Sequence, residues 1–157
     1  ACGRTLLLAE AFAVHEDRLK TDPGRYGMLA RHRFALGAFL TAADVIHAQR
    51  LRAKLTRAMT GAFDHADLLA LPGEAKGAPR FEDATESFPF VATPSLRIGF
   101  NLTGHPALVV PAGLDAHGMP LAIQLVARHG REDLLFAAGR VVERAVGMVD
   151  RWPPSAV

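Results

Sequence analysis

Residues 100–127 read FNLTGHPALVVPAGLDAHGMPLAIQLVA, and this stretch says more about the fold than any other part of the chain. Two short apolar runs, residues 107–110 and 121–127, flank a segment rich in Gly, Pro and Asp. Apolar runs bounded by turn residues are typical of β-strands, and residues 115–118 (Asp-Ala-His-Gly) predict the turn between them. The second run alternates along its length, which predicts a strand with one well-buried face.

The remaining sequence predicts four helices and a third strand. Helices are expected over about residues 5–19, 25–39, 42–63 and 131–146, and strands over about residues 68–71, 107–111 and 121–127. Asp22-Pro23-Gly24 ends the first helix, while Thr41 followed by Asp44 forms a weak capping box for the third. The segment 72–94 is rich in Gly, Pro and charge, so we expect a loop, and long loops are usually functional lids or disordered. The expected fold class is mixed α/β in a single domain of 157 residues.

The residues of this stretch also form a recognisable series of motifs. The series comprises Asn101-Leu-Thr-Gly104, Pro106-Ala107, Pro111-Ala-Gly113, Gly118, Pro120, Gln124-Leu125 and Glu132-Asp133. It resembles the C-terminal signature of the amidase-signature hydrolases. Further pieces that resemble this family lie at residues 8–11, 26–27, 31–37, 41–50, 67–72 and 78–79. The resemblance implies helices packed on part of a mixed β-sheet, and an N-terminal half that would complete the sheet.

The resemblance also implies where the catalytic residues are. Members of the family attack an amide with a Ser nucleophile from a Gly-Ser-rich segment, assisted by a second Ser in a cis peptide and by a Lys. The three serines of this chain are Ser87, Ser95 and Ser155, and none of them follows a Gly. We therefore expect the catalytic residues to lie N-terminal to Ala1, and the chain to be a C-terminal portion that is inactive alone.

Three residues are candidate contacts for the substrate. Asn101 is expected in the wall of the pocket, or as a cap of a turn or helix end. Arg97 stands four positions earlier, where related amidases usually carry a small or hydroxyl residue. An Arg there would form a bidentate pair with a substrate carboxylate, and the alternative is a solvated surface residue. Phe100, with Phe88 and Phe90, is expected to line the same pocket or to pack in the core.

Other features exclude several classes of function. The net charge of +2 and the absence of a basic stripe argue against nucleic-acid binding. The seven histidines show no metal-ligand spacing, so we expect neither a metal nor a cofactor. His105 replaces an apolar residue of the family and is expected in the core or at an edge with one backbone partner. A lone Cys2 and the lack of an apolar span or signal peptide favour the cytoplasm.

Three functions remain open from the sequence. The first is the C-terminal part of an amidase acting on a small-molecule amide. The second is an A-type subunit of a transfer-RNA amidotransferase, although the Tyr- and Lys-rich stretch of those proteins is missing here. The third is a non-catalytic subunit or scaffold. Half of the residues are hydrophobic and only about three strands are expected, so the chain is predicted to associate with an N-terminal half or with itself.

Overall fold

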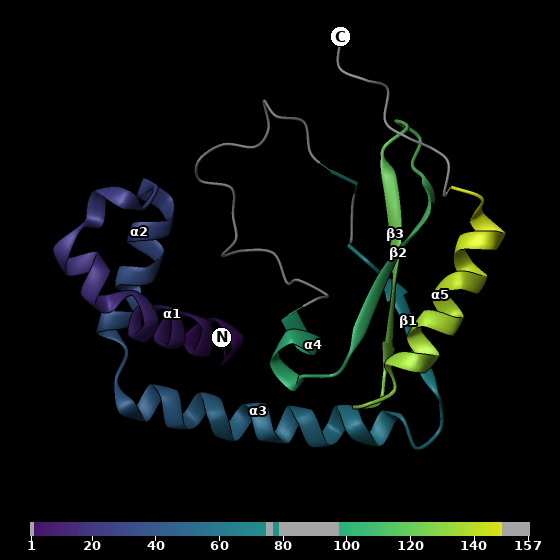
Figure 1. Ribbon diagram of the computed structural model, residues 1–157. Helices are drawn as coiled ribbons and strands as arrows, with labels where there is room; N and C mark the ends of the chain where they lie inside the picture. Colours follow the sequence, from purple (N-terminus) through teal and green to yellow (C-terminus); the bar gives the residue numbers. More distant parts are fainter. Residues whose placement is uncertain (1, 75–76, 79–97, 149–157) are drawn as a thin grey trace, which may run out of the picture. The chain divides into compact units, whose positions relative to one another are not determined.

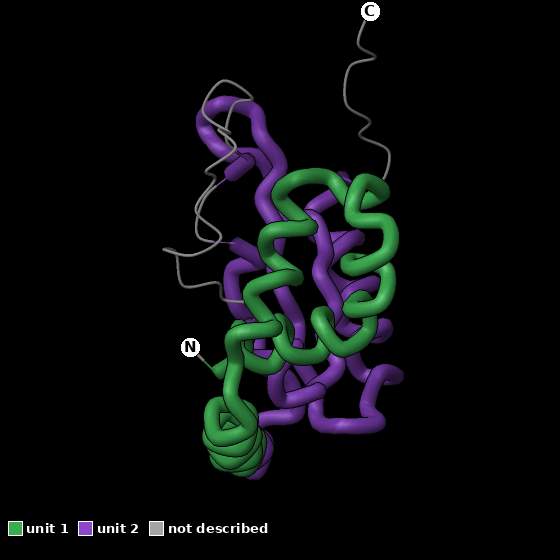
Figure 2. The backbone as a smooth tube through the Cα atoms, turned by 90° about the vertical axis from the view of Figure 1, so that its left-hand side faces the viewer, with its two compact units in different colours: residues 1–58 green, residues 59–157 purple. Residues whose placement is uncertain are grey.

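The computed structural model describes residues 2–74, 77–78 and 98–148. The chain divides into two compact units, an N-terminal unit of residues 1–58 and a C-terminal unit of residues 59–157 (Figure 2). Helices and strands occur together, as the sequence predicts, and the fold class is mixed α/β. Phe88 and Phe90, together with the rest of the expected loop beyond residue 78, lie outside the described residues.

The N-terminal unit is entirely helical in its described part. It consists of α1 (Cys2–Thr21), the 3₁₀ helix η1 (Pro23–Arg25), α2 (Met28–Ala35), the 3₁₀ helix η2 (Leu36–Phe39) and most of α3 (Ala42–Ala62) (Figure 1). The second helix therefore differs from the expected continuous helix 25–39, because extended backbone at Tyr26 and Gly27 separates two short pieces. Pro23 begins η1 directly after α1, where a proline lacking an N–H does least harm.

Local side-chain bonds define the ends and contacts of these helices. Thr41 and Asp44 form a reciprocal capping box at the start of α3, with Asp44 N donating to Thr41 Oγ1 at 3.1 Å and Thr41 N donating to Asp44 Oδ2 at 2.9 Å. The thiol of Cys2 donates to the carbonyl of Ala48, which joins α1 to α3. His15, Tyr26 and Phe34 form an aromatic cluster that holds α1, the η1 turn and α2 together.

The C-terminal unit contains the sheet. Its strands are β1 (Leu68–Pro72), β2 (Ala107–Leu114) and β3 (Pro120–Ala127), and its helices are α4 (Ile98–Thr103) and α5 (Glu132–Val146). The three strands are antiparallel in the order β1-β3-β2, so β3 is central. β2 extends beyond the expected end at residue 111 through a bulge between Pro111 and Gly113. The six-residue helix α4 is absent from the sequence-based expectation.

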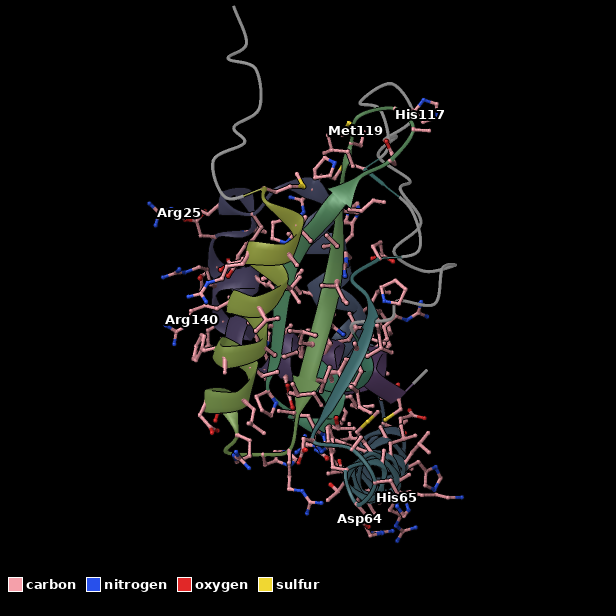
Figure 3. All side chains as sticks on the ribbon, turned by 90° about the vertical axis from the view of Figure 1, so that its right-hand side faces the viewer. Arg25, Asp64, His65, His117, Met119 and Arg140 are labelled. Atoms are coloured by element: carbon pink, nitrogen blue, oxygen red, sulfur yellow. The ribbon has the colours of Figure 1, made fainter. Side chains whose placement is uncertain are left out.

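The hairpin turn follows the expected chemistry. Asp115 Oδ1 accepts hydrogen bonds from the backbone N–H groups of His117 and Met119, at 2.8 and 2.9 Å. Gly118 has a φ of 79°, in the left-handed region that favours glycine. Figure 3 shows His117 and Met119 at this end of the hairpin, and Asp64 and His65 in the turn between α3 and β1, toward the other end of the sheet.

Helix α5 lies along one face of the sheet, and Arg140 projects from its outer side (Figure 3). Leu135 of α5 packs with Val110, Leu125 and Ala127 in one hydrophobic cluster. A second cluster, Phe63, Phe100 and Val126, covers part of the opposite face. The expectation of one well-buried face on β3 is therefore wrong for its second half: residues 124–127 are all buried, because a central strand has side chains packed on both sides.

Candidate functional site

Helix α4 holds two of the three predicted substrate contacts. Phe100 is 5% exposed and packs against Phe63 and Val126, so its ring anchors the helix to the sheet. Asn101 is the next residue, about 100° further round the helix, and it is exposed. Asn101 is thus inside a short helix, and the alternative that it caps a helix end is wrong. Arg97 lies outside the described residues, and contact of any of the three with a substrate stays a prediction.

A tight turn connects α4 to β2. Gly104 has a φ of 75°, and its N–H donates to the carbonyl of Phe100 at 2.8 Å, which closes the helix. The carbonyl of Pro106 then accepts a hydrogen bond from Ala127 N at 3.1 Å, which fixes the entry of β2 beside the end of β3. This geometry places Asn101 at a fixed point beside the sheet.

His105 is buried in this turn and has polar side-chain partners. Its exposed fraction is 4%, its Nδ1 lies 2.9 Å from the hydroxyl of Thr103, and its Nε2 lies 3.4 Å from the hydroxyl of Thr60. The histidine is in the core, as expected, but these partners are hydroxyls rather than one backbone group. The ring also stacks on Phe63, with centroids 5.4 Å apart. These contacts tie the α4–β2 turn to the end of α3.

A second histidine completes this cluster. The rings of His105 and His129 have centroids 4.0 Å apart, and His129 Nε2 donates to the carbonyl of Thr103 at 3.2 Å. Burial lowers the pKa of His105 below its ordinary value, and the neighbouring charge of His129 lowers that pKa further. His105 is therefore neutral at neutral pH. Sequence reasoning missed the pairing because the two residues lie in different loops.

Gln124 is another residue whose role the sequence does not reveal. It occupies the centre of β3, is 3% exposed, and its Nε2 has no hydrogen-bond partner among the described residues. The signal available in the sequence is an amide side chain in the middle of an apolar run.

The described residues also leave a small hollow beside α5. It has a volume of about 40 Å³ and is lined by Phe63, Ala66, Asp67, Arg128, Arg131 and Leu134. Pockets for small molecules usually measure roughly 300–1,000 Å³, so this hollow is too small for an amide substrate larger than a few atoms. Arg128 bonds the carbonyl of Phe63 and the carboxylate of Asp64, and both contacts hold the turn before β1.

Neither a metal cluster nor a membrane-spanning helix occurs in the described part of the chain. Among residues 2–74, 77–78 and 98–148, no three His, Cys, Asp or Glu side chains gather as a metal site would require. None of the helices described there combines the length and the apolar content needed to cross a bilayer.

Comparison with known proteins identifies the family. The family model named Amidase matches residues 8–136, which is well over half of the chain. The chain belongs to the amidase family. The match includes α4, the hairpin and the start of α5, so the buried Phe100, the exposed Asn101 and the His105 turn are all parts of an amidase fold.

Individual relatives agree with this assignment. The AmiD protein of Mycobacterium tuberculosis, described as an amidase, is 29% identical over 92% of this chain and 31% of its own length. The A-type chain of the glutamyl-tRNA(Gln) amidotransferase of Gluconobacter oxydans is 31% identical over 80% of this chain and 27% of its own length. A crystal structure of an amidase superposes with a TM-score of 0.78 and 27% identity, over 92% of this chain and 34% of that one. This amidase chain thus spans about a third of the length of these relatives.

Proposed function

We propose that this chain is the C-terminal part of an amidase that hydrolyses the C–N bond of a carboxamide. The reaction proceeds through an acyl-enzyme formed by a Ser, a second Ser in a cis peptide and a Lys, all outside this chain. The observation that carries the proposal is the family match over residues 8–136 in a chain that spans about a third of its relatives. The sequence adds support, since none of its three serines lies in a Gly-Ser segment.

In this proposal the chain contributes structure and part of the acyl pocket. The buried Phe100 ring fixes α4 against the sheet, and the helix then presents Asn101 outward. An amide side chain on a rigid element is well suited to orient a polar substrate group, because it both donates and accepts hydrogen bonds. Phe100 supports Asn101 from beneath, since its ring packs against Phe63 and Val126.

Arg97 gives the proposed pocket its preference for acidic substrates. It precedes Phe100 and Asn101 by three and four residues and is the predicted partner of a substrate carboxylate. Replacing Arg97 by Thr in the active enzyme is expected to lower kcat/KM for an acidic amide roughly 10- to 100-fold, with little effect on a neutral amide. Arg97→Lys is the matched control, because it keeps the charge but loses the bidentate geometry. Equal losses on acidic and neutral amides would assign Arg97 a structural role.

Two alternatives remain. The 31% identity to the A-type chain of an amidotransferase favours an amidotransferase role, which would need glutamine hydrolysis coupled to transfer-RNA binding. A non-catalytic subunit or scaffold is the third possibility, since the described strands form a three-stranded sheet with two edges. For the amidase and for the scaffold we propose that the chain pairs with an N-terminal half or with itself, binds neither nucleic acid nor membrane, and resides in the cytoplasm.

A reconstitution experiment tests the proposal. The chain alone is expected to hydrolyse no aliphatic or aromatic amide, whereas its complex with the polypeptide encoded immediately upstream of Ala1 is expected to release ammonia or an amine. Activity of the isolated chain that is lost in Ser87→Ala or Ser95→Ala would overturn the assignment of catalysis to other residues. Glutamine-dependent activity restricted to charged transfer RNA would favour the amidotransferase alternative.

A further inference from the structure

The last residue of α4 is bonded at both of its oxygens by histidines. The hydroxyl of Thr103 lies 2.9 Å from His105 Nδ1, and its carbonyl accepts a hydrogen bond of 3.2 Å from His129 Nε2. Thr103 is 7% exposed, so little water competes for either bond. The two histidines come from different segments, the turn between α4 and β2 and the loop between β3 and α5. Thr103 therefore joins α4 to both of these segments.

The bond from His129 meets a need that every helix end has. The last carbonyls of an α-helix have no partner within the helix. In α4 the carbonyl of Phe100 accepts from Gly104 N at 2.8 Å, and the carbonyl of Thr103 accepts from the His129 side chain. A basic side chain beside a helix C-terminus commonly makes such a bond. Because a carbonyl oxygen only accepts, the His129 ring carries a proton on Nε2.

A buried ring holds His129 in the orientation that this bond requires. The centroids of the His129 and His105 rings are 4.0 Å apart. His129 is exposed, whereas His105 is 4% exposed and stacks on Phe63, with centroids 5.4 Å apart. The exposed ring thus rests on a ring that is fixed in the core. The direction of His129 Nε2 toward Thr103 follows from this contact as well as from the bond itself.

Asn101 lies between the two points at which α4 is attached to the sheet unit. The first point is the buried ring of Phe100, which packs against Phe63 and Val126. One buried ring leaves a helix of six residues free to pivot about it, and the bonds to Thr103 remove that freedom. The direction of the exposed Asn101 side chain therefore depends on both points, and one of them involves His129.

We propose that His129 is a positioning residue for substrate binding, which holds α4 through the carbonyl of Thr103 and so fixes the direction of Asn101. The inference rests on the proposed function, in which Asn101 contacts the substrate. It adds a residue from the loop between β3 and α5, outside the motif that contains Asn101. His129 acts through α4 and takes no part in the chemistry.

Two substitutions separate the hydrogen bond from the bulk of the ring. His129→Gln places an amide N–H near the position of Nε2, whereas the shorter side chain of His129→Asn places it near the position of Nδ1. The first variant is expected to keep the bond to Thr103 and the second to lose it. Both are expected to fold, because His129 is exposed. His117→Asn changes an exposed histidine of the hairpin turn and is the control (Figure 3).

Hydrogen exchange of the chain alone tests the contact without any need for activity. Peptides that cover α4 and the turn to β2 are expected to exchange roughly three- to ten-fold faster in His129→Asn than in wild type. His129→Gln and His117→Asn are expected to match wild type. Equal exchange in all of these proteins would overturn the proposal, since the bond would then not hold α4.

Kinetics of the complex with the upstream-encoded polypeptide test the role in substrate binding. His129→Asn is expected to raise KM for the amide roughly three- to ten-fold with kcat unchanged within about two-fold, and His129→Gln to restore KM. Faster exchange with an unchanged KM, or a loss confined to kcat, would overturn the positioning role. A wild-type complex without amidase activity would overturn the proposed function and the positioning role with it, while the exchange result would still establish the contact between His129 and α4.

Discussion

The two units of the chain bury different kinds of side chain. In the N-terminal unit the buried apolar residues are Cys2, Leu6 and Ala48, while Phe39 and Val14 are 81% and 77% exposed. In the C-terminal unit Phe63, Phe100, Leu125 and Val126 are all at most 6% exposed and form two clusters. The sheet unit therefore contains a hydrophobic core of its own, whereas among its described residues the helical unit buries Leu6 together with the small residues Cys2 and Ala48.

Composition does not reveal this difference. The helix α3 carries apolar residues at helical spacing, but Leu51 and Leu55 are 44% and 41% exposed. An apolar stripe predicts burial only when the chain supplies something to pack against it. Large exposed apolar surface is typical of segments that pack against another polypeptide, which agrees with the proposal that this chain is part of a larger amidase.

The largest expected effect comes from emptying the core of the sheet unit. Leu125→Ala removes a side chain packed with Val110, Ala127 and Leu135, and we expect a loss of roughly 2–5 kcal/mol of unfolding free energy. Leu6→Ala is the matched variant of the helical unit, since Leu6 is 4% exposed and Leu125 is 5% exposed. The loss of unfolding free energy is expected to be smaller for Leu6→Ala, because its partly exposed neighbours can move into the space that the side chain leaves.

Hydrogen exchange measured by mass spectrometry reports each unit separately. Leu125→Ala is expected to raise exchange in β2, β3 and α5, and Leu6→Ala in α1 alone. Equal losses of unfolding free energy from the two variants would contradict the difference between the units. The helical unit would then depend on a hydrophobic core as much as the sheet unit does.

The second effect concerns two close helix contacts, one in each unit. A Cβ at Gly37 would collide with the backbone carbonyl of Leu8 and the Cβ of Phe12, neither of which can move without shifting α1. A Cβ at Gly139 would meet Leu108 Cδ2 at 2.6 Å, which is the end of a flexible side chain. We expect Gly37→Ala to cost about 1–3 kcal/mol, as overpacking does.

Gly139→Ala is the contrasting variant. It is expected to be near neutral, because Ala in place of Gly favours a helix interior by about 1 kcal/mol and offsets the shift of Leu108. Urea unfolding followed by circular dichroism measures both. A stabilising Gly37→Ala would show that α1 and η2 can move apart at little cost, and that the close contact at Gly37 does not hold them in place.

The sequence predicts much of the hairpin but not the surroundings of β3. Turn residues and apolar runs place both strands because these signals are local. Burial of Gln124 and Val126 depends on the strand order β1-β3-β2 and on Phe63 and Phe100, which come from elsewhere in the chain. A period of two along one strand carries no information about the opposite face.

The candidate site shows the same limit. Asn101 and Phe100 are adjacent in a recognisable motif, so both are visible in the sequence, while α4 is not: its six residues include Gly, Ile and Thr and complete fewer than two turns. The contact between His105 and His129 joins residues that the register of β2 and β3 brings together. Pairings of this kind follow from tertiary structure and leave no local signal.

A third and smaller effect tests whether local bonds sustain the helical unit. Thr41→Ala removes the hydroxyl that accepts from Asp44 N and is expected to cost about 1 kcal/mol, the usual value of an N-cap. Thr56→Ala is the control within the same helix, since Thr56 only donates back to the carbonyl of Arg52. That variant is expected to be neutral or slightly stabilising, because Ala is the better helix former. The thermal unfolding midpoints of the two variants measure this difference. Equal midpoints would mean that the capping box does not contribute to stability.

The smallest expected effect is a pH dependence that His105 gives to the sheet unit. Its pKa in the folded chain lies below the ordinary value of 6.5, first because of burial and then because of His129. The unfolded chain therefore binds more protons than the folded chain at pH values between the folded pKa and 6.5. The contribution of His105 to the free energy of unfolding is therefore fully present above pH 6.5, falls as the pH drops below that value, and levels off beneath the folded pKa.

His105→Leu removes the titrating group and fills the site with an apolar side chain, so the slope of unfolding free energy against pH is expected to flatten in this window. Urea unfolding of both proteins at about pH 8, 7, 6 and 5 measures the slope, with the two highest values as the internal reference. An unchanged slope in His105→Leu would mean that other groups carry the dependence, and that the buried histidine of the sheet unit acts only through packing.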